Sequence, residues 1–292
     1  MHETAGTPVW RPAFVVSGRT ARRIARAPDG PLEASLDLGR TRSTVRIEAD
    51  SATLPDGRTV DRAALAEAVS DGEDCIELTP AAPRKVYAYS RERCCYYKLF
   101  QPFEDRPPTI VINGATMHAI VGKDPWQDAA AKVGQVVAPR RGGRCLDTCC
   151  GLGYTAQLLV QTGFRPVVSC EVDPNVLAVA AVNPWSEGLW SEGIEVAPRD
   201  LRDIVADAPD ARFACIFHDP PTVHQAGDLY AEELYRAFAR VLAPGGVLYH
   251  YVGEPGRRVG RDYARGVIRR LQAAGFADVR RAVAGVLARK TR

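Results

Sequence analysis

The pattern of hydrophobic and polar positions changes near Asp124. Beyond it, short apolar runs typical of buried strands alternate with stretches in which apolar residues recur at helical spacing. Strands are predicted at residues 145–149, 167–172, 194–197, 213–218, 247–252, 277–283 and 285–289. Helices are predicted at residues 155–162, 175–182, 201–206, 232–242 and 262–274, after a first helix that ends before Pro139. Such repeated units predict an α/β fold with a doubly wound, Rossmann-like, mostly parallel sheet and a terminal antiparallel hairpin.

The first part of the chain lacks this alternation. Short strands are expected at residues 44–49, 52–54, 76–78, 85–89 and 110–112, with one short helix at 61–69. Turn sequences such as Pro55-Asp56-Gly57 and Asn113-Gly114 separate them. We therefore predict a small β-rich N-terminal domain, residues 1–115, for substrate recognition or dimerisation, and a Rossmann-like domain, residues 116–292. The aromatic-rich segment 94–103 is either the hydrophobic underside of the small domain or a wall of a substrate pocket.

The composition of the chain bears on its core, its membrane contact and its cellular compartment. The 292 residues are 46% hydrophobic, enough to bury one large core or two modest ones. No apolar run is long enough for a transmembrane helix, and the N-terminus does not resemble a signal peptide. Eight cysteines are present, of which five fall in or beside predicted core strands, where a free thiol packs as a small hydrophobe. We expect a cytoplasmic protein without membrane contact.

Metal and nucleic-acid binding have weaker support. No Cys-x-x-Cys pair occurs and the five histidines are scattered, so no metal site is predicted; the vicinal Cys94-Cys95 pair either packs or binds a thiophilic metal. The net charge of +3 is too small to indicate nucleic acid by itself. However, residues 257–292 hold eleven Arg or Lys and two acids. This segment is either a solvated basic surface or a patch for RNA or an anionic substrate.

A glycine-containing turn follows the first strand of the predicted Rossmann-like domain. Gly151 and Gly153 allow the backbone to approach a ligand, and the helix from about Thr155 directs free N–H groups toward it. Asp147, at the end of the strand, can receive a cation or hydroxyl groups. These features predict a pocket for a nucleotide-type ligand.

Acidic residues also follow the next three strands. Glu171 lies twenty-four residues after Asp147, Asp200 precedes Leu201 at the start of a helix, and Asp219 follows His218. In doubly wound sheets, ligands bind beyond the carboxyl ends of the strands. The four acids are therefore expected at one edge of the sheet, around the same ligand.

These residues together resemble the class I S-adenosylmethionine-dependent methyltransferases. The resemblance covers roughly residues 118–292 and rests on the order Asp147-x-Cys149-x-Gly151-x-Gly153, Glu171, Asp200, Asp219-Pro220-Pro221 and the Pro244-Gly245-Gly246 turn. Phrases such as Asn183-Pro184-Trp185-Ser186 and His250-Tyr251-Val252-Gly253 are similar to a little-characterised group of predicted methyltransferases best known from archaea. The resemblance implies S-adenosylmethionine as cofactor and S-adenosylhomocysteine as product.

The resemblance also implies roles for individual residues. Asp147 would lie near the amino group of the cofactor, Glu171 would hold the ribose hydroxyls, and Asp200 with Leu201 would frame the adenine. Cofactor contacts are further expected at Cys149, Gly151, Gly153, Tyr154, Thr155, Val172 and His218. One departure is Cys149, which replaces the first glycine of the family's loop and narrows the approach to the cofactor unless its side chain turns into the sheet. Packing is favoured over reactivity for this thiol.

The sequence His218-Asp219-Pro220-Pro221-Thr222 is similar to the Asp/Asn-Pro-Pro-aromatic motif of methyltransferases that act on nitrogen. Asp219 and His218 are the candidates for holding or accepting the proton of the acceptor. Thr222 replaces the aromatic residue, which weakens the expectation of a stacked flat base. His224, Tyr230, His250 and Tyr251 either line the pocket or pack in ordinary fashion. The favoured acceptor atom is nitrogen, before sulfur or oxygen, in a small molecule or in RNA.

Other functions remain open at this stage. Polyamine aminopropyltransferases share the sheet and an acidic loop after the fourth strand; Asp147 favours a cofactor that keeps its methionine ammonium and carboxylate. An NAD-dependent dehydrogenase would also have a glycine-rich first turn, but Cys149 and the Asp-Pro-Pro sequence disfavour it. A third alternative is a non-catalytic nucleotide- or RNA-binding module. Homodimerisation through the N-terminal domain is a further hypothesis.

Overall fold

The structure is a computed structural model that describes residues 9–11, 13–138, 140, 142–222, 226–253 and 262–291. Contacts group the chain into two compact units. The first unit contains Met1–Asp128 and Pro174–Gly188, and the second contains Ala129–Asp173 and Leu189–Arg292. The predicted division of roles between residues 1–115 and 116–292 stays a prediction.

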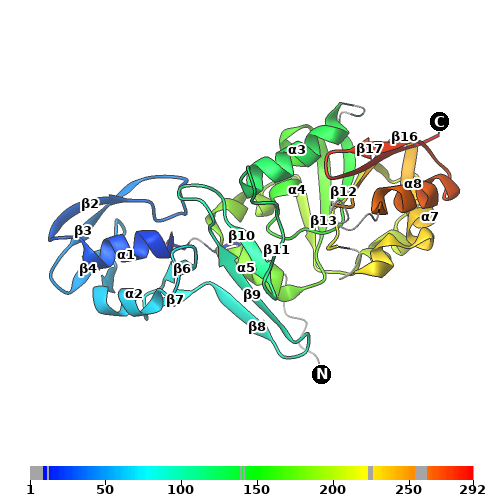
Figure 1. Cartoon of the computed structure of the whole chain (residues 1–292). Coiled ribbons are helices and arrows are strands. Elements are labelled where there is room, and N and C mark those ends of the chain that lie inside the picture. The colour runs from blue at the N-terminus through cyan, green and yellow to red at the C-terminus, as the bar shows by residue number, and fades with distance from the viewer. Residues whose placement is uncertain are drawn as a thin grey trace, which may run out of the picture. The chain divides into compact units, whose positions relative to one another are not determined.

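The second unit is built around a seven-stranded sheet with the order β14-β13-β12-β15-β16-β18-β17 (Figure 1). The first five strands are parallel, and β18 and β17 are antiparallel. Their bounds are β12 Gly143–Asp147, β13 Phe164–Cys170, β14 Ile194–Ala197, β15 Phe213–His218, β16 Leu242–Tyr251, β17 Phe276–Ala282 and β18 Gly285–Lys290. This sheet confirms the predicted α/β fold and its terminal hairpin.

The strand order creates a site for a ligand. β12 comes first in this sheet along the chain, and its neighbours are β13 on one side and β15 on the other. The connection that leaves β12 runs to β13 on one side, and the connection that leaves the adjacent strand β15 runs to β16 on the other side. The ends of β12 and β15 therefore form the switch point at which doubly wound sheets bind ligands.

Helices of the second unit supply its core. Apolar residues of α6, α7 and α8 pack with Leu146, Ile216 and Leu248 of three adjacent parallel strands, and Phe238 and Leu271 of this cluster are fully buried. The helices of this unit are α4 Tyr154–Gln161, α6 Leu201–Asp207, α7 Glu232–Val241 and α8 Tyr263–Ala273, with the 3-10 turn η2 Gly227–Tyr230. Helix α3, Pro125–Val137, and the 3-10 turn η1, Pro184–Trp190, each have residues in both units. None of the helices in the described ranges is long and apolar enough to cross a membrane.

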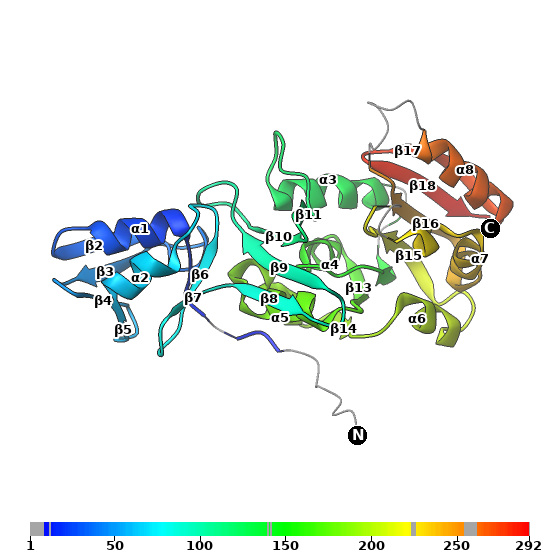
Figure 2. The ribbon, with the colours of Figure 1, turned by 60° about the horizontal axis from the view of Figure 1, so that its bottom comes forward.

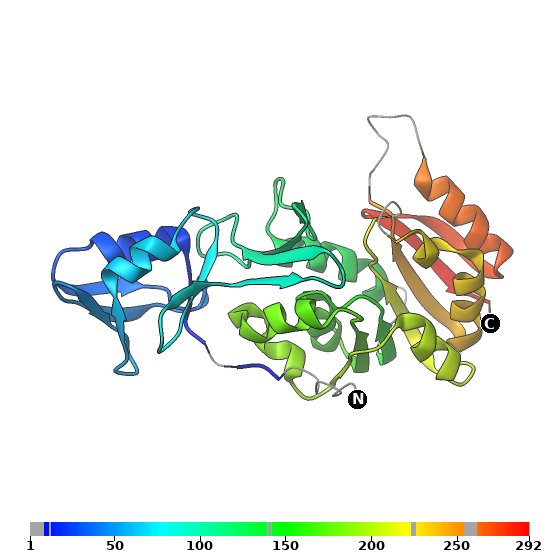
Figure 3. The same cartoon turned by 90° about the horizontal axis from the view of Figure 1, so that it is seen from below.

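The first unit contains three antiparallel sheets. Their orders are β1-β6-β7, β2-β3-β4-β5 and β11-β10-β9-β8 (Figures 2 and 3). The strands are β1 Val15–Ser17, β2 Gly30–Ala34, β3 Ser43–Ile47, β4 Ser51–Thr53, β5 Thr59–Asp61, β6 Cys75–Leu78, β7 Pro83–Lys85, β8 Tyr87–Ser90, β9 Cys95–Phe100, β10 Thr109–Ile112 and β11 Ala115–Thr116. The β-rich character expected of the N-terminal region is confirmed.

Helix α1, Gly18–Arg26, was not expected from the sequence. Ser17 caps it by accepting a hydrogen bond from the amide of Thr20 at 3.1 Å. Ala21 and Ile24 are buried on one side, whereas the intervening arginines lie on the other. This buried stripe is short and lies among four arginines, so the arginine-rich composition obscured it. The other helices of this unit are α2, Arg62–Ala68, which Asp61 caps, and α5, Pro174–Val182.

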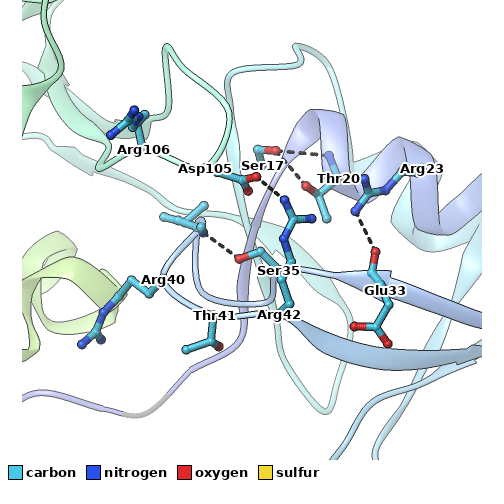
Figure 4. A network of polar contacts seen from close by, with 12 residues as sticks. Ser17, Thr20, Arg23, Glu33, Ser35, Arg40, Thr41, Arg42, Asp105 and Arg106 are labelled. Carbon is cyan, nitrogen blue, oxygen red and sulfur yellow. Dashed lines mark hydrogen bonds and ion pairs between the residues drawn. The ribbon is translucent and has the colours of Figure 1, made fainter.

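A polar network explains why residues 174–188 belong to the first unit. Figure 4 shows Arg40 and Thr41 in the loop between β2 and β3. Asp37 holds this loop by accepting hydrogen bonds from the amides of Arg40 and Thr41 at 3.0 and 2.9 Å. From this loop, the Arg40 guanidinium donates to the carbonyl of Pro184 at 2.6 Å and to Glu187 at 2.7 Å. These bonds tie the segment after α5 to a loop that precedes it by 144 to 147 positions in the chain.

Candidate active site

The turn between β12 and α4 has two glycines with positive φ, at +55° for Gly151 and +75° for Gly153. A Cβ at Gly153 would lie 2.8 Å from the side chain of Leu189, so this position requires glycine both for its backbone and for packing. A Cβ at Gly151 would meet no described atom within 4 Å. The loop therefore leaves open space beside Gly151, in front of the helix that begins at Tyr154.

Asp147 ends β12 with its side chain fully buried. Its Oδ2 accepts a hydrogen bond of 2.6 Å from the Ser169 hydroxyl, while Oδ1 has no partner among the described residues. Burial, together with the nearby charges of Asp219 and Glu171, raises the pKa of Asp147 to about 8, although the hydrogen bond from Ser169 opposes this shift. A buried carboxylate oxygen without a partner is costly, so the site is suited to a cation or to a strong donor.

Glu171 follows the end of β13. Its carboxylate accepts hydrogen bonds from the amides of Gly151 at 3.1 Å and Asp173 at 3.0 Å. Burial raises the pKa of Glu171 to about 7. The bond to Gly151 fixes the glycine turn against the end of the neighbouring strand, and each carboxylate oxygen retains capacity to accept from a hydroxyl.

Asp200 caps α6, as the N-terminal position of its helix requires. It accepts hydrogen bonds from the amide of Arg202 at 2.8 Å and from its guanidinium at 2.6 Å, and the latter lowers the pKa of Asp200. Leu201 is buried, whereas Val172 is 52% exposed. The amide of Glu171 donates to the carbonyl of Ala197 at the end of β14, which brings this loop beside the end of β13.

His218 ends β15 and is fully buried. Its Nε2 lies 2.9 Å from the carbonyl oxygen of Leu229 and must donate, so Nδ1 accepts the Thr148 hydroxyl at 2.7 Å. Burial lowers the pKa of His218 to about 4. The ring is therefore neutral near pH 7, with both nitrogens engaged by the protein.

Asp219 forms an ion pair that the sequence did not suggest. Its Oδ2 lies 2.9 Å from Nζ of Lys132, whose side chain is 4% exposed. The same Nζ lies 4.5 Å from the centre of the Tyr251 ring, a cation–π contact. One signal was present: Lys132 falls at helical spacing from the buried Ala129 and Val136 of α3, and a lysine on a buried stripe needs a counter-ion.

The other aromatic and histidine side chains near this edge pack beneath the loop. The Tyr230 hydroxyl donates to the carbonyl of Pro221 at 2.9 Å, and Tyr235 lies 2.7 Å from Nε2 of the buried His250. The rings of His218 and His250 are 4.5 Å apart. Burial holds the pKa of His250 well below its usual value. His224 lies outside the described residues.

The cysteines of the turn are not activated. Burial, followed by the charge of Glu171, raises the pKa of Cys149 well above its usual value, and burial does the same for Cys150. Such thiols are poor nucleophiles, which agrees with packing as the favoured role. No group of three His, Cys, Asp or Glu side chains within the described ranges is arranged to hold a metal ion.

Comparison with known proteins identifies a domain match and a relative of this chain. Residues 145–246 match the sequence profile of a methyltransferase domain. The chain is also 35% identical over 284 residues to an uncharacterised protein of Methanocaldococcus jannaschii, a match that covers 95% of this chain and 96% of that protein. The chain belongs to one family with this archaeal protein and carries a methyltransferase domain. The acidic residues described above thus lie on a methyltransferase sheet.

Solved structures agree with this fold for the methyltransferase. A spermidine synthase in complex with the transition-state analogue AdoDATO is similar with a TM-score of 0.56 and 20% identity, over 70% of this chain and 72% of that chain. Spermidine synthase from Thermotoga maritima has a TM-score of 0.52 and 19% identity, over 70% and 71%. At such identities the similarity concerns the fold.

The structure brings the predicted acids of the methyltransferase to one edge. Asp147, Glu171 and Asp219 follow the adjacent strands β12, β13 and β15, and Asp200 starts the helix after β14. Tyr154 and Thr155 lie in the first turn of α4, and their side chains are buried. Lys132 and Thr148 are the site residues that the sequence did not reveal.

Proposed function

We propose that the chain transfers the methyl group of S-adenosylmethionine to a nitrogen atom, before sulfur or oxygen, of a small-molecule or RNA acceptor and releases S-adenosylhomocysteine. The observation that carries this proposal is the partnerless Oδ1 of the fully buried Asp147. An ammonium group placed there would pair with the carboxylate and remove the cost of its burial.

The remaining residues fit the same cofactor. Gly151 borders open space at the N-terminus of α4, where backbone amides suit a carboxylate. Glu171 would accept from the ribose hydroxyls, and Asp200, Leu201 and Val172 would lie at the adenine. When bound, the cofactor supplies a methyl group activated by its sulfonium charge. The residues of the chain then need only to align the acceptor and to hold its proton.

Asp219 is the residue proposed to contact the acceptor. Its carboxylate, which pairs with Lys132 at 2.9 Å, can accept a hydrogen bond from the acceptor N–H. His218 is proposed to orient Thr148 rather than to transfer a proton, because both its ring nitrogens are engaged. The bond from Tyr230 to the Pro221 carbonyl would keep this loop in place.

Aminopropyl transfer is the second candidate, and the fold of the spermidine synthases supports considering it. Decarboxylated S-adenosylmethionine also keeps its ammonium, so Asp147 alone does not separate the two donors. The buried Lys132 favours methyl transfer, because its positive charge beside Asp219 would repel a cationic diamine acceptor.

Ligand-dependent thermal unfolding tests the proposal. S-adenosylmethionine or S-adenosylhomocysteine at a hundred times its Kd should stabilise the chain by about 2.7 kcal/mol, which raises Tm by roughly 5–10 °C. NAD(H) should leave Tm unchanged. A shift with NAD(H) alone would refute the proposal, and a larger shift with decarboxylated S-adenosylmethionine would favour the aminopropyl alternative.

Replacing Glu171 with Ala should weaken S-adenosylhomocysteine binding by on the order of tenfold or more, since hydrogen bonds to a charged acceptor are lost. Calorimetry measures this, and a 2′-deoxy analogue should bind the variant as well as the normal ligand does. The exposed Glu192→Ala is the matched control and should bind normally. Unchanged affinity in Glu171→Ala would remove Glu171 from the ribose role.

A further inference from the structure

The four-stranded sheet β11-β10-β9-β8 has two unlike faces. Helix α5 packs against β8 and β9, and Tyr97 and Leu99 of β9 are buried (Figures 2 and 3). Because side chains alternate along a strand, Tyr96 and Lys98 point to the opposite face. Tyr87 and Tyr89 share this opposite face, since the register pairs them with Lys98 and Tyr96.

We call Tyr87, Tyr89 and Tyr96 the tyrosine face. Tyr87 is 55% exposed and Tyr89 56%. The rings of Tyr87 and Tyr96 are stacked, with centroids 6.2 Å apart and an angle of 26° between planes. Gly114, in the turn between β10 and β11, lies beside the Tyr96 hydroxyl and adds no side chain over it. Solvent-exposed aromatic rings that lie together on one face of a sheet are typical of surfaces that bind a partner.

The charges around the tyrosine face are mostly positive. Residues 84–98 contain five Lys or Arg and one acid, Glu92. Arg84 pairs with Glu77, and Lys85 and Lys98 share the buried Asp74, so these three are partly neutralised. Arg91 and Arg93 are exposed in the turn between β8 and β9. The tyrosine face therefore borders a positively charged turn between β8 and β9.

We propose that the tyrosine face binds single-stranded RNA, with bases stacked on Tyr87 and Tyr89 and phosphates near Arg91 and Arg93. Flat antiparallel sheets with exposed rings stack unpaired bases, and cationic edges bind the phosphate backbone. A duplex buries the faces of its bases and cannot stack in this way. The exposed Arg91 and Arg93 beside the rings favour a polyanion over a nonpolar protein surface. This inference does not rest on the proposed methyl transfer.

Fluorescence anisotropy with a short, labelled, mixed-sequence single-stranded RNA tests the proposal. The full chain should bind this RNA more tightly than the same strand in a duplex. Tyr87→Ala and Tyr89→Ala should each weaken binding about tenfold, whereas Tyr→Phe at either position should retain it. The control Phe103→Ala removes another exposed ring and should have no effect. Tm and S-adenosylhomocysteine affinity report whether each variant is folded.

Salt dependence separates the stacking residues from the charged ones. Arg91→Ala and Arg93→Ala should each reduce the slope of log affinity against log salt by about one, and the tyrosine variants should leave the slope unchanged. Equal binding of single and double strands, or no binding at low salt, would overturn the proposal. So would loss of binding only in Arg265→Ala or Arg269→Ala of the basic C-terminal segment. Light scattering that shows a dimer disrupted by Tyr87→Ala, without RNA binding, would assign the face to a second copy.

Discussion

Asp147→Asn should abolish most cofactor binding without unfolding the chain. The amide keeps the size of the carboxyl group and can accept from Ser169, but its NH₂ would face the ammonium proposed to lie at Oδ1. Affinity for S-adenosylhomocysteine should fall on the order of a hundredfold, the upper range for hydrogen bonds to charged groups. Calorimetry on the two proteins measures the loss. The control Asp203→Asn, in the first turn of α6, should bind normally.

The pH dependence of the same variant gives an independent test. Because the pKa of Asp147 is raised to about 8 in the folded protein, the folded state binds this proton more tightly than the unfolded state. The ligand-free protein should therefore lose stability as pH rises from about 4 toward 8, while the ionised carboxylate needed for an ammonium accumulates. Cofactor affinity should rise over the upper part of this interval in the normal protein and be flatter in Asp147→Asn. An equally steep rise in both proteins would contradict the role of Asp147.

Breaking the pair of Lys132 and Asp219 should destabilise the protein more than removing it entirely. Asp219→Asn leaves the buried Lys132 without its counter-ion, at a cost of about 3 kcal/mol. Lys132→Met replaces the cation with an apolar chain of similar length, and the double variant should be more stable than Asp219→Asn alone. Denaturant unfolding of the four proteins measures the coupling. Additive effects of the two substitutions would show that the pair is not energetically coupled.

Asp219→Asn should also separate binding from catalysis. Its Kd for S-adenosylhomocysteine should change by less than about threefold, whereas turnover with an acceptor should fall by on the order of a hundredfold, since the group that holds the acceptor proton is gone. Transfer of label from S-adenosylmethionine to the acceptor measures turnover. Equal losses in affinity and turnover would place Asp219 at the cofactor instead.

Local signals in the sequence were sufficient for the sheet and for one side of the site. Buried strands such as β12 and β15 are continuous apolar runs. Such a run predicts a buried strand even when the neighbouring strands are not known. The end of each strand is also visible locally, as the point where the apolar run stops. The positions of Asp147, Glu171 and Asp219 at the carboxyl edge of the sheet therefore follow from the order of strands and helices. The positive φ of Gly151 and Gly153 likewise agrees with the glycine pattern.

Helix α1 and the grouping of residues 174–188 with the first unit were not predicted, for different reasons. In Gly18–Arg26 four arginines surround the buried Ala21 and Ile24, so the arginine-rich composition masks the helix although Ser17 supplies a cap. Helix α5 has the strongly apolar sequence of a Rossmann helix, yet it packs against β8 and β9 in the first unit. An apolar helix does not specify its partner, and distant contacts such as Arg40 with Pro184 decide it.

The sequence by itself therefore determined the fold class and the edge at which a ligand would bind, because both depend on periods and residue types within short segments. Tertiary structure alone decided which groups meet there: Lys132 pairs with Asp219 across 87 positions of the chain, and Thr148 with His218 across 70. The same holds for the tyrosine face, since alternation along β8 and β9 defines two faces but only packing decides which one α5 covers. Side-chain charge and exposure at such contacts depend on residues brought together by folding, and these are not encoded in any local pattern.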